Sequence, residues 1–306
     1  MSEPAMQLID VHKSIGKKEI IKGLSFTINK GEVFGFIGPN GAGKTTTIRM
    51  MVGLMNITEG DIRILGNSIK TEHKAAIREV GAIVENPEMY PFMSGWQNLL
   101  HYARMIPGIS KERIHEVVRL VGLEKPIKER AGKYSLGMRQ RLGIAQALLH
   151  KPSVLILDEP TNGLDPAGIR EIRKYIRSLA ESEGVAVIIS SHLLAEIEQM
   201  CDRIGIIKNG ELITTQHLHE TTEEQQLHQI QMEVDPLEKA LDLLTTHHEI
   251  EGKIVGDLIT FQGDKRNMPL YIQTLVENQI SVYQVGVSKA TLEDKFFDLI
   301  GENIIE

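Results

Sequence analysis

Short runs rich in apolar residues alternate with amphipathic stretches over the first two thirds of the chain. Runs of this length are typical of strands that are buried inside a sheet. The predicted strands are Gln7–Val11, Glu32–Ile37, Asp61–Ile64, Val80–Val84, Val154–Leu157, Ala186–Ser190 and Arg203–Lys208. Helical stretches separate many of them, which predicts an α/β fold with a largely parallel core sheet.

The segment from about Pro91 to Leu149 has a different pattern. Apolar residues recur there at helical spacing, as in Trp96, Leu99 and Ala103, with little strand character. We therefore expect a helical insertion between two strands of the core sheet, forming a subdomain of about residues 86–150.

The pattern changes again near residue 220, after a polar stretch at His217–Gln226 that suits a linker or a final polar helix. The elements predicted beyond it are a strand at Leu227–Val234, a helix at Leu237–Thr245, strands at Ile250–Val255 and Leu258–Gln262, a helix at Met268–Asn278, a strand at Ser281–Val287 and a last helix at Thr291–Leu299. The order β-α-β-β-α-β is that of a ferredoxin-like unit. We predict a first domain at 1–220 and a small α+β accessory domain at 221–306.

Composition and charge are those of an ordinary globular protein. Of the 306 residues, 42% are hydrophobic and 25% are charged, so each of two domains is able to bury a core. No segment approaches the roughly 18–20 apolar residues of a membrane helix, and no apolar signal core is evident at the N-terminus. The single cysteine, Cys201, fits a reducing cytosol. The net charge of −7 argues against a nucleic-acid partner.

A glycine-rich string between a predicted strand and a predicted helix carries the strongest chemical signal. It matches the P-loop pattern G-x-x-x-x-G-K-[ST] and consists of Gly38, Pro39, Asn40, Gly41, Ala42, Gly43, Lys44, Thr45 and Thr46. Glycines let successive backbone N–H groups converge on phosphate oxygens, and the helix N-terminus adds partial positive charge. We expect Lys44 to reach the β- and γ-phosphates and Thr45 to ligate Mg²⁺. The string thus predicts binding of a nucleoside triphosphate.

Two carboxylates follow the apolar run Val154–Leu157. Ligands of α/β sheets bind at the carboxyl ends of the strands, which is where Asp158 and Glu159 emerge. Asp158 is spaced to hold Mg²⁺ directly or through water, and Glu159 to polarise an attacking water as general base. The alternative interpretation of these two residues is an exposed acidic turn, and the P-loop upstream disfavours it.

Two further strings narrow the class of nucleotide-binding protein. In Tyr134-Ser-Leu-Gly-Met138, Ser135 is a candidate N-cap, and the N–H groups from Gly137 onward form a second anion site. Ser190-Ser191-His192 closes a predicted strand, and Asp165 follows shortly after the acidic pair. In this order the motifs resemble the ATP-binding cassette (ABC) family, whose signature Leu-Ser-Gly-Gly-Gln lies just upstream of its Walker B strand.

The resemblance covers about residues 6–216 and implies a P-loop ATPase that one chain does not complete. In the family, two ATPase domains pack head to tail, so Ser135 and Gly137 would contact ATP held by a partner's P-loop. Asp165 resembles the D-loop aspartate, and His192 the switch histidine that contacts the γ-phosphate. One cassette per chain implies a second ATP-binding domain, in a homodimer or a heterodimer.

Several positions depart from the family pattern, among them Leu136 in place of the first signature glycine. Glu85 stands where the Q-loop has glutamine, and its carboxylate approaches Mg²⁺ and the lytic water as an anion rather than an amide. We expect Glu85 to be both a catalytic and a metal-binding residue. Met138 replaces the last signature glutamine. Ile15 stands where an adenine-stacking aromatic is usual, and an aliphatic contact selects adenine less strongly, which leaves GTP as an alternative.

Glu85 and the Ser-Leu-Gly-Met signature resemble the subgroup that handles bacitracin, lantibiotics and related peptide antibiotics. The tail Ala290–Leu299 resembles the closing helix of drug-export cassettes. These likenesses imply the Mg²⁺-dependent ATPase subunit of an exporter, cytoplasmic and held at the inner face of the cell membrane by a separate permease. A sodium or other small-solute exporter is the alternative, and a soluble ABC ATPase acting on ribosomes or DNA is less favoured.

In the family, the start of the helical insertion meets the permease. An apolar docking surface is predicted there from Pro87, Tyr90, Phe92 and Trp96. The same residues could instead form the core of the insertion, and the sequence does not separate the two interpretations.

Overall fold

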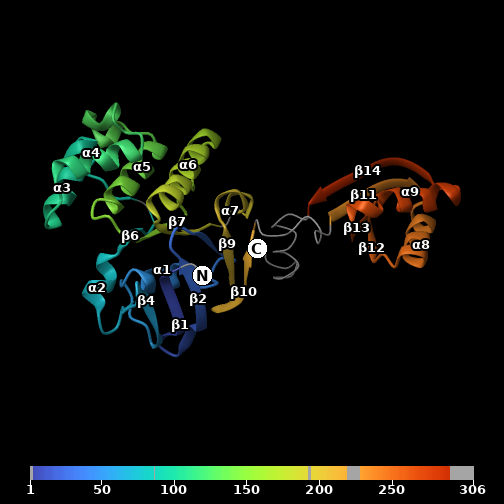
Figure 1. The fold of residues 1–306 in the computed structure, drawn as a ribbon, viewed down its shortest axis with the longest axis horizontal. Helices are drawn as coiled ribbons and strands as arrows, with labels where there is room; N and C mark the ends of the chain where they lie inside the picture. The colour runs from blue at the N-terminus through green and yellow to red at the C-terminus, as the bar shows by residue number, and fades with distance from the viewer. Residues whose placement is uncertain (1–2, 86, 192–193, 219–227, 290–306) are drawn as a thin grey trace. The chain divides into compact units, whose positions relative to one another are not determined.

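A computed structural model describes residues 3–85, 87–191, 194–218 and 228–289, in two compact units (Figure 1). The described part of the first unit ends at Leu218, and that of the second is 228–289. The predicted polar segment His217–Gln226 falls largely outside the described residues, as do His192 and the predicted last helix Thr291–Leu299.

A six-stranded sheet forms the centre of the first unit. Its strand order is β10-β9-β3-β8-β7-β6, with β3 and β6 to β9 parallel and β10 an antiparallel edge. The strands are β3 (Val33–Ile37), β6 (Val80–Ile83), β7 (Val154–Asp158), β8 (Ala186–Ser190), β9 (Arg203–Lys208) and β10 (Glu211–His217). Every residue of β3, β7 and β8 is buried, which explains their continuous apolar runs. The predicted α/β fold with a largely parallel core sheet is confirmed.

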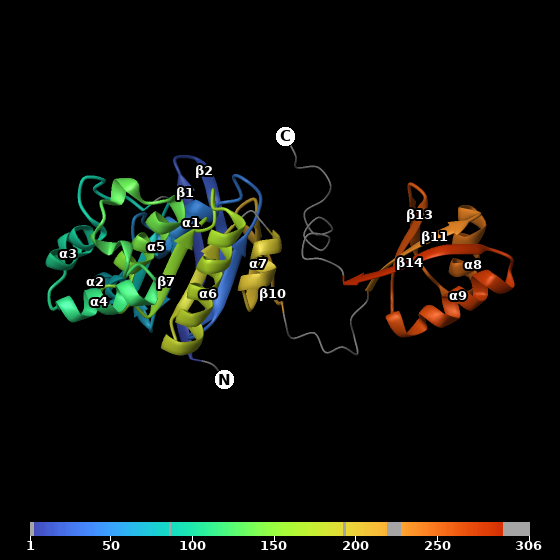
Figure 2. The same cartoon turned by 90° about the horizontal axis from the view of Figure 1, so that it is seen from above.

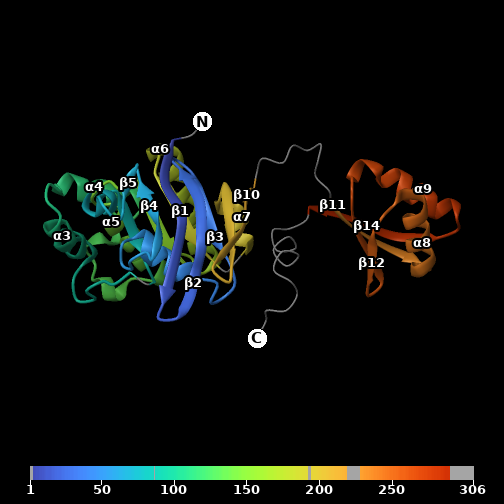
Figure 3. The same ribbon diagram turned by 90° about the horizontal axis from the view of Figure 1, so that it is seen from below.

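A separate antiparallel sheet with strand order β2-β1-β4-β5 packs on this core (Figure 3). It comprises β1 (Pro4–Ile15), β2 (Lys18–Asn29), β4 (Glu59–Ile64) and β5 (Asn67–Ser68). Phe26 of β2 stacks on Phe34 and Phe36 of β3, with ring centroids 5.3 and 5.7 Å apart. Aromatic stacking therefore helps to hold the strand that leads into the P-loop.

Strand β2 is not among the elements that the sequence predicted. Its apolar positions alternate only from Leu24 to Ile28, because Gly23, at φ +77°, interrupts the alternation. The edge strand β10 was also missed, since its half-buried side chains are mostly polar.

Three helices and two short 3₁₀ turns form the predicted helical insertion between β6 and β7. The helices are α3 (Gly95–Met105), α4 (Lys111–Leu120) and α5 (Leu136–Ala147), and the turns span Pro126–Lys128 and Ala131–Lys133. Figure 2 shows these helices grouped together beside the core sheet. Ser94 and Gln97 form a reciprocal capping box that begins α3, and Ser110 caps α4.

Four more helices complete the first unit around its sheets: α1 (Lys44–Met51), α2 (His73–Arg78), α6 (Pro166–Glu183) and α7 (Leu194–Met200). Helix α6 ends at Gly184, which adopts a left-handed conformation at φ +67°. Among the residues described, no helix combines the length and the apolar character needed to span a membrane.

The second unit has the predicted β-α-β-β-α-β order. Its elements are β11 (His228–Asp235), α8 (Leu237–His248), β12 (Gly252–Val255), β13 (Leu258–Gly263), α9 (Met268–Glu277) and β14 (Ser281–Lys289). The sheet has the order β12-β13-β11-β14 and is antiparallel throughout. Ile230, Met232 and Val234 alternate with more exposed residues of β11 and enter a core of their own. The ferredoxin-like prediction is confirmed for the described residues.

We predict that Ile156→Ala lowers the free energy of unfolding of the first unit by about 2–5 kcal/mol, because it leaves a cavity in the fully buried centre of β7. The chain has one tryptophan, Trp96, which lies in this unit, so its fluorescence during urea unfolding reports on the unit alone. Ile213→Ala, on the exposed side of edge strand β10, is the control and should cost under about 1 kcal/mol. Equal losses in both variants would contradict the assignment of β7 as the core strand.

Candidate functional site

The P-loop runs from the end of β3 to the start of α1 and is shaped by two of its glycines. A Cβ atom at Gly38 would lie 2.3 Å from the carbonyl oxygen of Ile207, and one at Gly43 2.5 Å from Cδ1 of Ile21. Gly43 also has φ +110°, a conformation that side chains disfavour. The loop therefore packs its backbone directly against β2 and β9.

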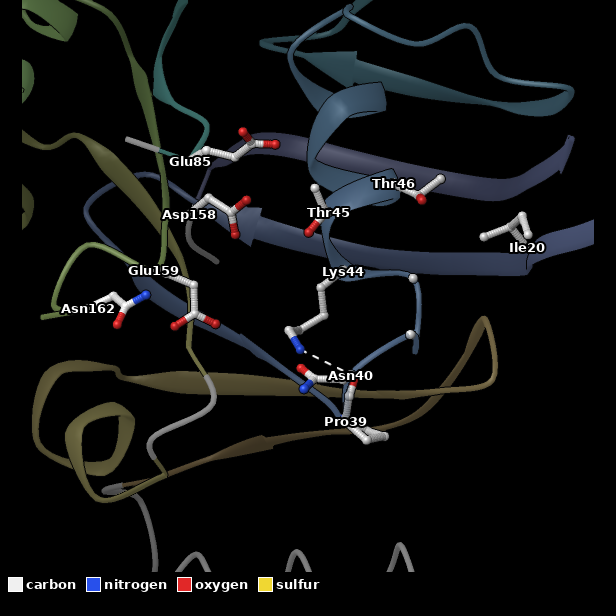
Figure 4. A pocket seen from close by; sticks show the side chains of 12 residues that line it. Ile20, Pro39, Asn40, Lys44, Thr45, Thr46, Glu85, Asp158, Glu159 and Asn162 are labelled. Atoms are coloured by element: carbon white, nitrogen blue, oxygen red, sulfur yellow. Dashed lines mark hydrogen bonds between the residues drawn. The ribbon is translucent and has the colours of Figure 1, made fainter. Parts of the chain in front are cut away.

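A cavity of about 520 Å³ opens over this loop (Figure 4). Its lining comes from the P-loop with α1, from β2, and from the segments after β6 and β7: Ile20, Pro39, Asn40, Gly41, Gly43, Lys44, Thr45, Thr46, Glu85, Asp158, Glu159 and Asn162. Motifs that are far apart in the sequence thus meet in one cleft of a size suited to a small ligand.

Lys44 is the half-buried cation of the cleft. Its Nζ donates to the carbonyl oxygens of Gly38 and Pro39, at 2.6 and 3.4 Å. Burial lowers the pKa of the Lys44 ammonium, while the charges of Glu159 and Asp158 act in the opposite direction. A bound phosphate would add further negative charge beside it, so an anionic ligand stabilises the ammonium form.

The acidic pair at the end of β7 is held by a serine on the neighbouring strand. Asp158 is buried, and Ser190 Oγ donates a hydrogen bond to its Oδ1. The same hydroxyl accepts the backbone N–H of Glu159 at 3.1 Å. Ser190 and Asp158 face each other because β7 and β8 are paired in parallel. Sequence reasoning missed this role of Ser190; its only signal was a polar residue closing a buried apolar strand.

Glu85 and Glu159 share an unusual backbone conformation. Each follows a parallel core strand, and their φ angles are +69° and +51°, in the left-handed region that glutamate seldom occupies. Such outliers cluster at functional sites, where the surrounding structure offsets their cost. The Glu85 carboxylate also lies 2.7 Å from Nη2 of Arg49 on α1, a contact that the sequence did not predict.

Thr45, Asp158 and Glu85 line the same cleft and offer a hydroxyl and two carboxylates. Oxygen donors of this kind suit Mg²⁺, which typically takes one or two carboxylates together with phosphate oxygens and water. Within the described residues there is no group of three or more His, Cys, Asp or Glu side chains arranged to hold a metal by itself. The donor set therefore fits an ion that is shared with a phosphate ligand.

The signature residues Ser135 and Gly137 lie outside this cleft. Ser135 caps α5, its Oγ accepting the backbone N–H of Met138 at 3.2 Å, as predicted. Asp165 likewise caps α6 through the N–H of Gly168, at 2.9 Å.

The signature and the loop that precedes α6 interlock within the chain. A Cβ atom at Gly163 would lie 2.9 Å from Cδ2 of Leu136, and one at Gly137 3.6 Å from Cδ2 of Leu164. Leu136, which replaces a family glycine, is thus accommodated by the bare backbone of Gly163, and the start of α5 packs against the loop that precedes α6.

Two further residues, Ile15 and His192, were predicted to contact the nucleotide. Ile15, at the end of β1, is 52% exposed and does not line the cleft, whereas Ile20 of β2 does. A role for Ile15 beside adenine stays a prediction. His192 lies outside the described residues, so its contact with the γ-phosphate also stays a prediction.

Comparison with known proteins agrees with the geometry. A family profile described as ABC transporter matches residues 21–162. The uncharacterized ABC transporter ATP-binding protein YhcH of Bacillus subtilis is 52% identical, covering 97% of this chain and 96% of that protein. The bacitracin transport ATP-binding protein BcrA of Bacillus licheniformis is 41% identical, covering 97% of each. A solved ATP-binding subunit of an ABC transporter is 29% identical with a TM-score of 0.63, covering 70% of this chain and 90% of that one.

We predict that Ser190→Ala destabilises the first unit by about 1–3 kcal/mol, because the buried Asp158 carboxylate loses its donor. It should also slow ATP hydrolysis at least about tenfold, since small displacements of reacting groups are costly. Trp96 fluorescence in urea and phosphate release measure the two effects. Ser153→Ala is the control, because its hydroxyl donates to Glu79, which does not line the cleft. Hydrolysis reduced equally in both variants would argue against a role for Ser190 in placing the acidic pair.

Proposed function

This chain belongs to the ATP-binding proteins of ABC transporters, and we propose that it powers export of a peptide antibiotic through a separate membrane permease. Its activity as an ATPase subunit follows from the family. The cleft that joins the P-loop to Asp158, Glu159 and Glu85 is the observation that carries the mechanism. The cargo rests on the relative named for bacitracin transport, whose similarity extends over 97% of this chain and so includes the second unit.

We assign the chemical roles to groups that line the cleft. Backbone N–H groups of the P-loop and Lys44 bind the phosphates of ATP. Thr45, Asp158 and Glu85 would hold Mg²⁺, and the ion would supply charge neutralisation at the phosphates. Glu159 acts as the general base that polarises the attacking water. Ser190 positions Asp158 and the backbone of Glu159 through the two hydrogen bonds of its hydroxyl.

The lid of the site belongs to a second ATP-binding domain, in a homodimer or a heterodimer. Ser135 and Gly137 do not line the cleft of their own chain, which supports a role across the dimer interface. The N–H groups that begin α5 are suited to an anion held by the partner. Leu136 packs against Gly163 and Leu164 against Gly137, which supports a signature that moves together with Asp165.

The permease docks at the start of the helical insertion, which places the protein at the inner face of the membrane. The four predicted docking residues differ in their surroundings. Pro87 packs against Gly143 of α5, and the Trp96 ring contacts His115 in a tilted arrangement with centroids 4.5 Å apart. Phe92 is 66% exposed beside the exposed Tyr90, with ring centroids 5.8 Å apart. Exposed aromatics are typical of interfaces, so we assign docking to Tyr90 and Phe92.

We expect Glu159→Gln to abolish nearly all ATP turnover and to trap an ATP-bound dimer, because the amide binds like the carboxylate but does not act as a base. Phosphate release and size-exclusion chromatography with ATP and Mg²⁺ measure the two effects. Glu181→Gln, on the exposed side of α6 beside Arg177, is the matched control and should turn over normally. Unchanged turnover in the Glu159 variant would rule out its assignment as general base.

We expect disruption of the gene together with that of its permease to raise susceptibility to bacitracin or to lantibiotics, measured as growth inhibition. Wild-type protein should restore resistance, and the Glu159→Gln variant should not, because export depends on hydrolysis. Unaltered susceptibility to every peptide tested would reject the cargo and favour export of sodium or another small solute.

A further inference from the structure

Arg49 is the cation closest to Glu85 in the described structure. Its Nη2 lies 2.7 Å from Oε1 of the carboxylate, and the two side chains are 42% and 65% exposed. Arg49 stands in the last turn of α1, where a cation is favoured by the helix dipole. The pair therefore links the helix that begins at the P-loop to the segment after β6.

Arg49 also lies one helical turn beyond Thr45, so the two residues share a face of α1. Thr45 and Asp158 are assigned to Mg²⁺ together with Glu85. Figure 4 shows Glu85, Asp158 and Thr45 around the same part of the cleft. The Glu85 carboxylate thus contacts a cation of the chain and lines the same cleft as the other residues assigned to Mg²⁺.

A glutamine at this position would behave differently. A neutral amide interacts with a guanidinium far more weakly than a carboxylate does, and it adds no negative charge to the cleft. The left-handed backbone at Glu85 restricts how this residue is placed. Rotation of the Glu85 side chain, rather than movement of its backbone, would therefore bring the carboxylate to Arg49 or to Mg²⁺.

Resting on the proposed function, we propose that Arg49 is a positioning residue that holds Glu85 back from Mg²⁺. Pairing with Arg49 offsets the negative charge that Glu85 would otherwise present to the metal. Mg²⁺ and Arg49 then compete for the Glu85 carboxylate, and this competition sets how much Mg²⁺ contributes to nucleotide binding. Because the pair is partly exposed, its effect is modest, about two- to fivefold in affinity.

The test measures binding rather than turnover. In the hydrolysis-deficient Glu159→Gln background, the dissociation constant of trinitrophenyl-ATP is measured with Mg²⁺ and with EDTA. The value in EDTA divided by the value in Mg²⁺ gives the contribution of the metal to binding. Arg49→Met should raise this ratio about two- to fivefold, because Glu85 loses its competing partner. Arg49→Lys should keep it near the starting value. Glu85→Gln should lower it, and adding Arg49→Met to Glu85→Gln should change it no further.

Arg63→Met is the matched control, because it removes another partly exposed pair, with Asp61 on β4, away from the cleft. It should leave the ratio unchanged. If Arg49→Met has no effect, or has the same effect when Glu85 is already glutamine, the role of Arg49 through Glu85 is overturned. If trinitrophenyl-ATP does not bind at all, or binds without regard to Mg²⁺, the proposed nucleotide site itself fails.

Discussion

Burial of the central parallel strands on both faces is the constraint from which the site follows. Every residue of β7 and β8 is buried, so a polar side chain is tolerated only where hydrogen bonds satisfy it. That place is the carboxyl end, where Asp158 and Ser190 satisfy each other. Because β7 and β8 are parallel neighbours, both polar groups reach the same edge of the sheet, where ligands of α/β proteins bind.

An element was predicted from the sequence where the burial of its residues produces a regular local pattern of apolar positions. Strands β3 and β7 were predicted because their apolar runs are continuous. Strands β11 and β13 of the second unit were predicted because one face of each is buried and their residues alternate accordingly. Strand β2 was missed because Gly23 breaks the alternation, although its Phe26 stacks beneath the P-loop strand.

Motifs predicted which residues meet in the cleft better than they predicted which neighbouring residues contact them. The P-loop, Asp158, Glu159 and Glu85 lie in one cleft, as their order in the sequence had indicated. Ser190 and Arg49 gain their roles only through contacts with residues 32 and 36 positions away. Local periodicity carries no information about such contacts. The contact of Leu136 with Gly163 likewise appears only in the folded structure, where the start of α5 packs against the loop before α6.

The acid at position 85 changes the charge balance of the whole cleft. Three carboxylates, Glu85, Asp158 and Glu159, line a cavity of about 520 Å³, and among the described residues that line it Lys44 is the only lysine or arginine. The phosphates of a nucleotide would add further negative charge beside these carboxylates. Arg49, beside the cleft, offsets one of these charges through its contact with Glu85. A glutamine at that position would remove the third carboxylate and with it the electrostatic reason for an arginine on this face of α1, so the two residues are best understood as one feature.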